Sequence, residues 1–514
     1  MKKAITFLTI LLTFGFTQAQ APAIEWQKSL GGTNTDEARC IQLTSDGGYI
    51  VAGDSNSINV NVTGNHGGPD YWVVKLDANR NIQWQKSFGG TSTDIANSIQ
   101  NTPDGGYIVA GQSNSNNGDV TANHGGIDYW IVKLDVTGTI QWQKSLGGSG
   151  NDVANAIQIT TDNGYVVAGY SQSDDGDVTG HHGVSGQADI WIVKLDATGN
   201  VLWQKSLGGS GDDNANAIQN TSDGGYIVAG STNSFEGDIT ENHGSYDYWV
   251  VKLDAVGTIQ WQKSIGAWGN DYASAIQTTS DSGYIVAGSS TSIYGTNTGT
   301  RADYDYWVVK LDDVGTIQWQ RSIGYPDQDY ANTIQTTSDG GYIVTGSSYA
   351  NSGATTGNHG LWDYWVIKLD NSGTLQWQKF LGGSDYDFAF SILTASDGGY
   401  IVAGTSLSSD YDITGNIHGY DCWIVKLASE ALSAPAFENN ALVIYPNPVC
   451  DILQIQTSKN TIITGFKMTD ILGKVIIEQN QNSNTINVEN LTQGVYILNA
   501  YSGEKKYAAK FVKE

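Results

Sequence analysis

Residues 94–144 read DIANSIQNTPDGGYIVAGQSNSNNGDVTANHGGIDYWIVKLDVTGTIQWQK, and close copies of this block fill most of the chain. Three of its elements recur seven times each: W-Q-K/R, D-x-W and D-x-G-Y-[IV]-V-x-G. The Trp of W-Q-K/R falls at Trp26, Trp84, Trp142, Trp203, Trp261, Trp319 and Trp377, at intervals of 58 residues with one of 61. Self-similarity at a fixed period predicts a repeat architecture.

Each repeat predicts four antiparallel strands. In the quoted block they are 94–99, 107–111, 129–134 and 140–144, and an Asp104-Gly105 turn joins the first two. Asp-Gly favours a tight hairpin because such turns need positive φ. Gly138 marks the last turn, and its counterpart in the first repeat is Arg80, where we expect Asn79 to take the strained conformation instead. Four strands with aromatic signatures are typical of a β-propeller blade, with an open β-solenoid as the alternative.

The two ends of the repeat region predict a closed ring. The chain enters with a fourth strand at 24–29 that has no partners before it, and the last repeat ends at Leu427 without a fourth strand. Pairing these ends hides an exposed strand edge. We therefore predict an all-β, seven-bladed β-propeller over residues 22–428, whose last blade is completed by the N-terminal strand.

Composition and the N-terminus indicate an exported protein. Lys2 and Lys3, an apolar run from residue 4 to 16 and small residues near Ala21 predict a Sec signal peptide over residues 1–21. No later segment resembles a transmembrane helix. The chain has 52 acidic and 26 basic residues, a formal net charge of −26, which disfavours nucleic acid as a partner. Its three cysteines have no regular spacing, so we expect no disulfide framework.

Candidate ligand residues lie in the long loops between the second and third strands and between consecutive repeats. Trp268 and Trp362 fall outside the repeated Trp series, and Arg301 replaces a His found in the other repeats. Asp271 and Asp329 belong to a series of Asp that opens every repeat. That series either rings the channel mouth as a polar or cation site or caps turns. The repeated Trp are expected to be core residues.

Oxygen-rich loops leave a calcium site open. Asp119, Asp175, Asp177 and Asp238 lie in stretches that loosely follow calcium loops without the spacing of an EF-hand. The loop His, such as His66, is expected to bond to its own loop. No catalytic motif is found, so enzymatic activity is not expected, although paired carboxylates leave it open. No cofactor other than calcium is predicted.

The tail follows a linker over 429–441. It contains Tyr445-Pro446-Asn447-Pro448, then D-x-x-G-K with Gly473 and Lys474, L-x-x-G-x-Y with Gly494 and Tyr496, and a basic-aromatic end with Lys510 and Lys513. Alternating strands with Gly turns predict a small Ig-like β-sandwich over 442–514. These motifs, in this order, resemble the type A C-terminal sorting domain of the type IX secretion system of Bacteroidota.

The resemblance implies a route and partners. Sec export would deliver the chain to the periplasm, and the type IX machinery would pass it to the surface or the medium, with a sortase-like protease removing the tail. The motif residues would be the sorting signal. From the repeats we expect a surface-exposed or secreted module that binds a glycan or protein. The alternatives are a structural or adhesion component, or an enzyme acting on an extracellular polymer. A cluster of non-repeated residues near the axis would favour binding or catalysis over a structural role.

Overall fold

We describe a computed structural model of the chain. It covers residues 20–183, 186–291, 303–349, 357–416, 419–430, 442–457, 463–470, 474–479, 484–502 and 505–514. Every named element in these ranges is a β-strand. The described residues contain no helix that is long and apolar enough to cross a membrane. The chain separates into two compact units, Met1–Glu430 and Ala431–Glu514. The fold is therefore all-β in each described part, as predicted.

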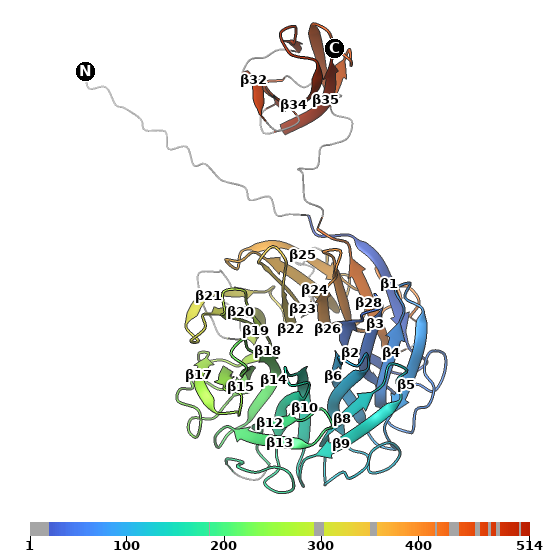
Figure 1. The fold of residues 1–514 in the computed structure, drawn as a ribbon, viewed down its shortest axis with the longest axis vertical. Helices are drawn as coiled ribbons and strands as arrows, with labels where there is room; N and C mark the ends of the chain where they lie inside the picture. Colours follow the sequence, from blue (N-terminus) through green and yellow to red (C-terminus); the bar gives the residue numbers. More distant parts are fainter. Residues whose placement is uncertain are drawn as a thin grey trace, which may run out of the picture. The chain divides into compact units, whose positions relative to one another are not determined.

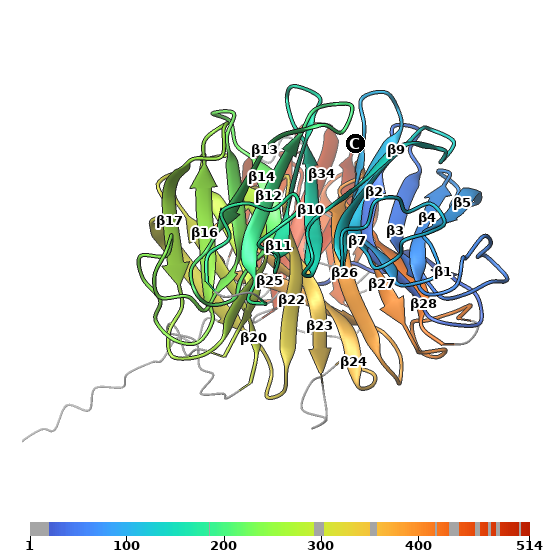
Figure 2. The same cartoon turned by 90° about the horizontal axis from the view of Figure 1, so that it is seen from below.

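Four-stranded antiparallel sheets form the first unit. They stand around a central axis (Figure 1) and are seen from the side in Figure 2. The sheets made of consecutive strands are β2 (Asp36–Leu43), β3 (Tyr49–Ser55), β4 (Asp70–Leu76) and β5 (Ile82–Phe88); β6 (Asp94–Asn101), β7 (Tyr107–Ser113), β8 (Asp128–Leu134) and β9 (Ile140–Leu146); β10 (Asp152–Ile159), β11 (Tyr165–Ser171), β12 (Asp189–Leu195) and β13 (Val201–Leu207); β14 (Asp213–Asn220), β15 (Tyr226–Thr232), β16 (Asp247–Leu253) and β17 (Ile259–Ile265); β18 (Asp271–Thr278), β19 (Tyr284–Ser290), β20 (Asp305–Leu311) and β21 (Ile317–Ile323); and β22 (Asp329–Thr336), β23 (Tyr342–Tyr349), β24 (Trp362–Leu369) and β25 (Leu375–Leu381).

One further sheet joins the two ends of this unit. It consists of β26 (Asp387–Thr394), β27 (Tyr400–Ser406), β28 (Asp421–Leu427) and, as its fourth strand, β1 (Ile24–Leu30). Gln27 pairs with Val425, and its side-chain oxygen accepts a hydrogen bond of 2.8 Å from the Trp423 indole. The N-terminal strand thus completes the sheet of the last repeat and covers the edge of β28 that would otherwise be exposed.

Large aromatic rings fill the space between neighbouring sheets. Trp130 on β8 is fully buried and meets Tyr71 of the preceding sheet, with ring centroids 4.5 Å apart. The Tyr71 hydroxyl donates to the Trp130 carbonyl at 2.7 Å. Ile50 and Ala52 of one sheet belong to the same apolar cluster as Trp130 of the next. The D-x-W tryptophans are therefore core residues, as predicted.

The outer tryptophans cover glycines of the following repeat. Trp84 on β5 lies against Gly138, which has a φ of +76° and where an added Cβ would come within 2.8 Å of the indole. Glycine is needed there for both reasons. The expectation for Asn79 is wrong, because Arg80 itself has a φ of +69° at this turn position. Its guanidinium lies 5.4 Å from the ring centroid of Trp26, a cation–π contact that offsets part of the backbone strain.

A lysine buried in each third strand ties it to the first turn of the same sheet. Lys75 is almost fully buried, and its Nζ donates to Asp46 at 2.8 Å and to the Leu76 carbonyl at 2.9 Å. Burial acts to raise the pKa of Asp46, but hydrogen bonds from Lys75, Thr44 and Gly48 outweigh it and hold the pKa at about 2. The charged pair thus closes the hairpin end of each sheet.

The second unit contains two sheets around one core. One sheet is β29 (Leu442–Tyr445), β30 (Ile452–Thr457) and β33 (Thr485–Asn487), and the other is β32 (Val475–Gln479), β31 (Gly465–Asp470), β34 (Gly494–Ser502) and β35 (Lys505–Lys513). Leu453 and Ile455 of the first sheet share an apolar cluster with Met468, Leu498 and Phe511 of the second. This is a packed pair of antiparallel sheets.

Candidate functional site

Two positions of the repeat hold aromatic residues in one part of the ring only. The first position precedes the third strand and holds Pro69, Ile127, Ala188, Tyr246, Tyr304, Trp362 and Tyr420 in successive repeats. The second follows the Asp that opens the first strand and holds Glu37, Ile95, Val153, Asn214, Tyr272, Tyr330 and Phe388. Both positions become aromatic in the later repeats, whereas the buried strands around them stay nearly constant.

These aromatic side chains lie next to one another across four sheets. Ring centroids are separated by 5.0 Å for Tyr246 and Tyr272, 6.1 Å for Tyr272 and Tyr304, and 5.0 Å for Tyr304 and Tyr330. The series continues from Tyr330 to Trp362 and from Trp362 to Phe388, each at 5.6 Å. We call this series, Tyr246, Tyr272, Tyr304, Tyr330, Trp362 and Phe388, the aromatic track. Three of its members lie on first strands, which line the centre of the ring (Figure 1).

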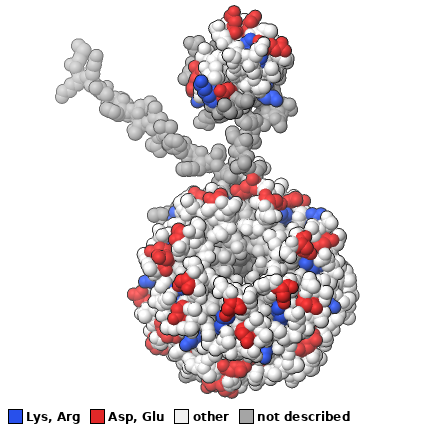
Figure 3. Space-filling view, in the orientation of Figure 1, with Lys and Arg blue, Asp and Glu red and all other residues white. Residues whose placement is uncertain are grey.

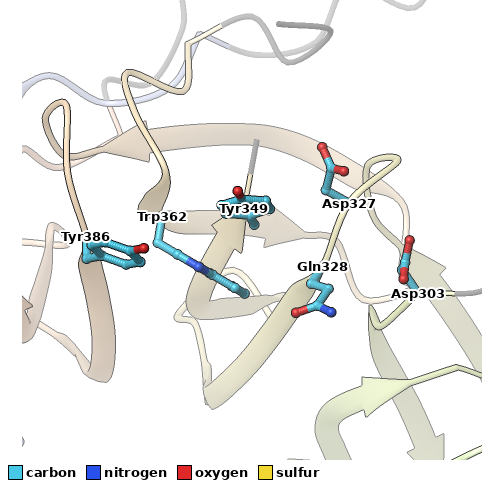
Figure 4. A pocket seen from close by; sticks show the side chains of 6 residues that line it. All are labelled: Asp303, Asp327, Gln328, Tyr349, Trp362 and Tyr386. Atoms are coloured by element: carbon cyan, nitrogen blue, oxygen red, sulfur yellow. The ribbon is translucent and has the colours of Figure 1, made fainter. Parts of the chain in front are cut away.

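A pocket of about 300 Å³ opens at one end of the track. Its lining residues are Asp303, Asp327, Gln328, Tyr349, Trp362 and Tyr386 (Figure 4). Trp362 is half-buried, and its indole also contacts the Tyr349 ring at 5.3 Å. The pocket therefore combines aromatic faces with two carboxylates and one carboxamide, the mixture that ligand sites use for contact area and orientation.

Hydrogen bonds hold the tyrosines of the track in place. The Tyr246 hydroxyl donates to Asp212 at 3.2 Å, Asn270 donates to the Tyr304 hydroxyl at 3.3 Å, and the Tyr330 hydroxyl donates to Gln328 at 3.3 Å. The three partners occupy one repeat position, the residue before the Asp that opens the first strand. Burial, and then neighbouring Tyr304 and Tyr246, raise the pKa of Tyr272. The Tyr272 hydroxyl thus stays protonated, and the three hydrogen bonds orient the rings of Tyr246, Tyr304 and Tyr330.

The predicted ligand residues are only partly brought together. Trp362 lines the pocket. Trp268 lies on a loop with its side chain 96% exposed and is not a pocket residue. Arg301 lies outside the described residues. The track was not identified from the sequence, although comparing one repeat position across all repeats would have found it.

Asp271 and Asp329 have the contacts of turn caps. Both are fully buried; Asp271 accepts from the Ala267 amide at 3.1 Å, and Asp329 accepts from the Tyr325 amide at 2.6 Å. Asp36 shows the same arrangement with Gly32 and Ser57. Since these carboxylates hold the loops between repeats, a ligand role for Asp271 and Asp329 stays a prediction that the proposed site does not need.

The candidate calcium residues contact loop backbone. Asp119, Asp177 and Asp238 accept from the Gly89, Gly147 and Gly208 amides at 3.2–3.3 Å, and Asp175 accepts from Ser149 at 2.6 Å. Within the described ranges, no group of three or more His, Cys, Asp or Glu is arranged to hold a metal ion. Calcium binding stays a prediction.

The loop histidines bond within their own loops. His66 donates its backbone amide to Asp70 at 2.7 Å, and its Nδ1 lies 2.7 Å from the same oxygen. His124 and His243 repeat the contact with Asp128 and Asp247. Burial raises the pKa of Asp70 to about 6, against the lowering effect of its bonds to His66. This agrees with the structural role expected for these histidines.

Two of the sorting motifs contact the C-terminal strand β35. The Asn447 side chain accepts from the Val512 amide at 2.8 Å and donates to the Lys510 carbonyl at 3.3 Å. Tyr445, Pro446, Asn447 and Pro448 are exposed, as are Lys474 and Lys510, whereas Lys513 is largely buried. Tyr496 is buried against Phe511, with ring centroids 5.6 Å apart. Gly473 lies outside the described residues, and Gly494 begins β34.

Comparison with known proteins identifies the tail. Residues 443–514 match the family model described as the secretion system C-terminal sorting domain. A curated protein, the regulatory protein FlaEY of Caulobacter vibrioides, is 28% identical over 168 residues. That alignment covers 31% of this chain and 18% of FlaEY, so the chain spans less than a fifth of this relative.

Solved structures with similar folds have low sequence identity. One is PorZ, a bacterial surface component of the type IX secretion system of Porphyromonas gingivalis. It is 11% identical, the match covers 94% of this chain and 60% of the PorZ chain, and the TM-score is 0.39. Another is puromycin hydrolase, which is 11% identical. The match covers 95% of this chain and 62% of the hydrolase chain, with a TM-score of 0.45. The four-stranded sheets around one axis make the first unit a repeat β-propeller, and the type IX sorting domain at 443–514 indicates export to the cell surface or the extracellular space.

Proposed function

We propose that the first unit is a seven-bladed propeller that binds an extracellular glycan at the pocket around Trp362. Residues 1–21 act as the signal peptide, 22–428 form the propeller, 429–441 are a linker and 442–514 are an Ig-like sorting domain. The type IX machinery and its sortase-like protease are the partners during export. Only the propeller would then face the environment as the functional part.

The observation that carries this proposal is the aromatic track and its pocket. Aromatic rings offer apolar faces on which the C–H faces of a sugar ring stack, and carboxylates and amides accept or donate bonds at its hydroxyls. The pocket residues Trp362, Tyr349 and Tyr386 supply the rings, and Asp303 and Gln328 supply the polar groups. The feature is confined to some repeats of a nearly uniform ring, which favours a ligand over a purely structural role.

A glycan array tests this with two matched tryptophan variants. The purified protein should give specific hits that Trp362→Ala loses and Trp268→Ala keeps, because only Trp362 lines the pocket. Each array is run with calcium and with chelator, which separates a calcium-dependent site from the pocket. An array without specific hits, or hits that both variants retain, would contradict a glycan site at Trp362.

A further inference from the structure

The aromatic track extends well beyond the pocket. Trp362 belongs to the sheet β22–β25, but Tyr272 and Tyr304 belong to β18–β21, and Tyr246 precedes β16 in the sheet β14–β17. Phe388 continues the track onto β26 on the other side. A ligand confined to the pocket would leave most of these rings without contact.

The spacing of the rings suits a chain of repeating units. Consecutive centroids along the track lie 5.0–6.1 Å apart, a step similar to the length of one sugar unit in an extended chain. The planes of neighbouring rings are inclined by 22–41°, and each ring is half-buried, so each presents part of its surface. The hydroxyls of Tyr246, Tyr304 and Tyr330 are bonded to Asp212, Asn270 and Gln328, so the exposed parts of the rings are what these residues offer a ligand.

Three acidic residues of the described part of the chain line the pocket or bond to the track. The charged residues that line the pocket are Asp303 and Asp327, and Asp212 bonds to Tyr246 at the far end. The face of the ring shown in Figure 3 carries more acidic than basic side chains, and so does the whole chain, with 52 acidic and 26 basic residues. Such a surface repels carboxylated or sulfated chains and tolerates neutral or cationic ones.

We infer that the ligand is a linear oligosaccharide of neutral or amino sugars, which lies along the aromatic track from Tyr246 across three sheets and has one end in the Trp362 pocket. This inference rests on the proposed glycan function. It adds the class of ligand: an extended chain rather than a single terminal sugar, without acidic groups.

The test uses chain length and substitutions that the repeat itself already contains. Val153 and Ala188 occupy the positions of Tyr272 and Tyr246 in another repeat, so Tyr272→Val and Tyr246→Ala place residues that the same backbone accepts. Binding of β-1,4-linked oligomers of glucose, glucosamine and mannuronic acid, from dimer to hexamer, is measured by calorimetry with the purified protein. Thermal melts confirm that each variant is folded.

For the neutral or amino series we expect affinity to rise about tenfold from dimer to hexamer as more rings are covered. Tyr272→Val should lower hexamer affinity about fivefold and leave the dimer unchanged. Trp362→Ala should weaken both. Equal affinity for dimer and hexamer, no effect of either track variant, or tightest binding of mannuronate oligomers would overturn the inference and leave a single-pocket glycan site standing. If no oligomer binds in a Trp362-dependent manner, the inference and the proposed function both fail.

Discussion

The Trp362 indole stacks on the Tyr330 ring, with centroids 5.6 Å apart and planes inclined by 22°, although strand β23 separates their two strands in the sheet. Trp362 is the first residue of β24 and Tyr330 the second of β22, so the two residues lie at the same end of the sheet. In the second repeat the same positions hold Ile127 and Ile95, and no aromatic pair is available there. The local asymmetry is therefore a property of side chains rather than of the backbone.

Gly138 offers a stability test of the contact between repeats. Gly138→Ala adds a Cβ 2.8 Å from the Trp84 ring at a φ of +76°, whereas Gly105→Ala adds one at +83° with no atom within 4 Å. Gly105→Ala should cost about 1 kcal/mol from backbone strain, and Gly138→Ala about 2–4 kcal/mol because overpacking is added. Urea unfolding measures both. Equal losses would mean that the indole does not restrict this turn.

The closing strand is expected to be needed for the whole ring. Removal of residues 20–30 strips the sheet β26–β28 of its fourth strand and of the Gln27–Trp423 hydrogen bond. We expect loss of a single cooperative unfolding transition and a rise in aggregation from the exposed edge. Gln27→Ala alone should cost about 1 kcal/mol, as should Gln85→Ala, which removes the equivalent bond to Trp72. A truncated protein that melts like the intact one argues against closure by β1.

Asp363 predicts a pH dependence of stability. Its side chain is fully buried, and burial, with repulsion from Asp387 and Asp412, raises its pKa to about 8 despite the His359 amide bond. The native state therefore keeps a proton that the unfolded state loses near 3.8, so stability should fall as pH rises from about 4 to 8. Asp363→Asn should remove this pH-dependent loss of stability, because a carboxamide does not titrate. Between pH 5 and 8, the melting temperature of the variant relative to that of the wild type should rise with pH. A difference in melting temperature that stays constant with pH would rule the effect out.

Asn447 links the Tyr445–Pro448 segment to the C-terminal strand β35. Asn447→Ala removes both side-chain bonds to 510 and 512, at a cost of about 1–2 kcal/mol locally. The Val512 amide should then exchange its hydrogen several-fold faster. Asn447→Asp keeps the acceptor for Val512 and should show little change at that amide. Unchanged exchange in Asn447→Ala would show that the motif does not hold the strand.

The sequence predicted the repeated sheets and the closing strand well, because the W-Q-K/R, D-x-W and D-x-G-Y elements recur with one period. It also identified the tail, whose motifs are contiguous. The aromatic track was missed because Tyr246, Tyr272 and Trp362 are distant in the chain and become neighbours only when sheets pack. Arg80 was misjudged because the turn requires positive φ at one fixed position, whatever residue occupies it.

A crystal structure of the protein with a bound glucosamine hexamer tests the central claim most directly. We expect one sugar ring against Trp362 in the pocket and further units over Tyr330, Tyr304 and Tyr272. Sugar density at the exposed Trp268, in the long loops between second and third strands, or at no ordered position would contradict it.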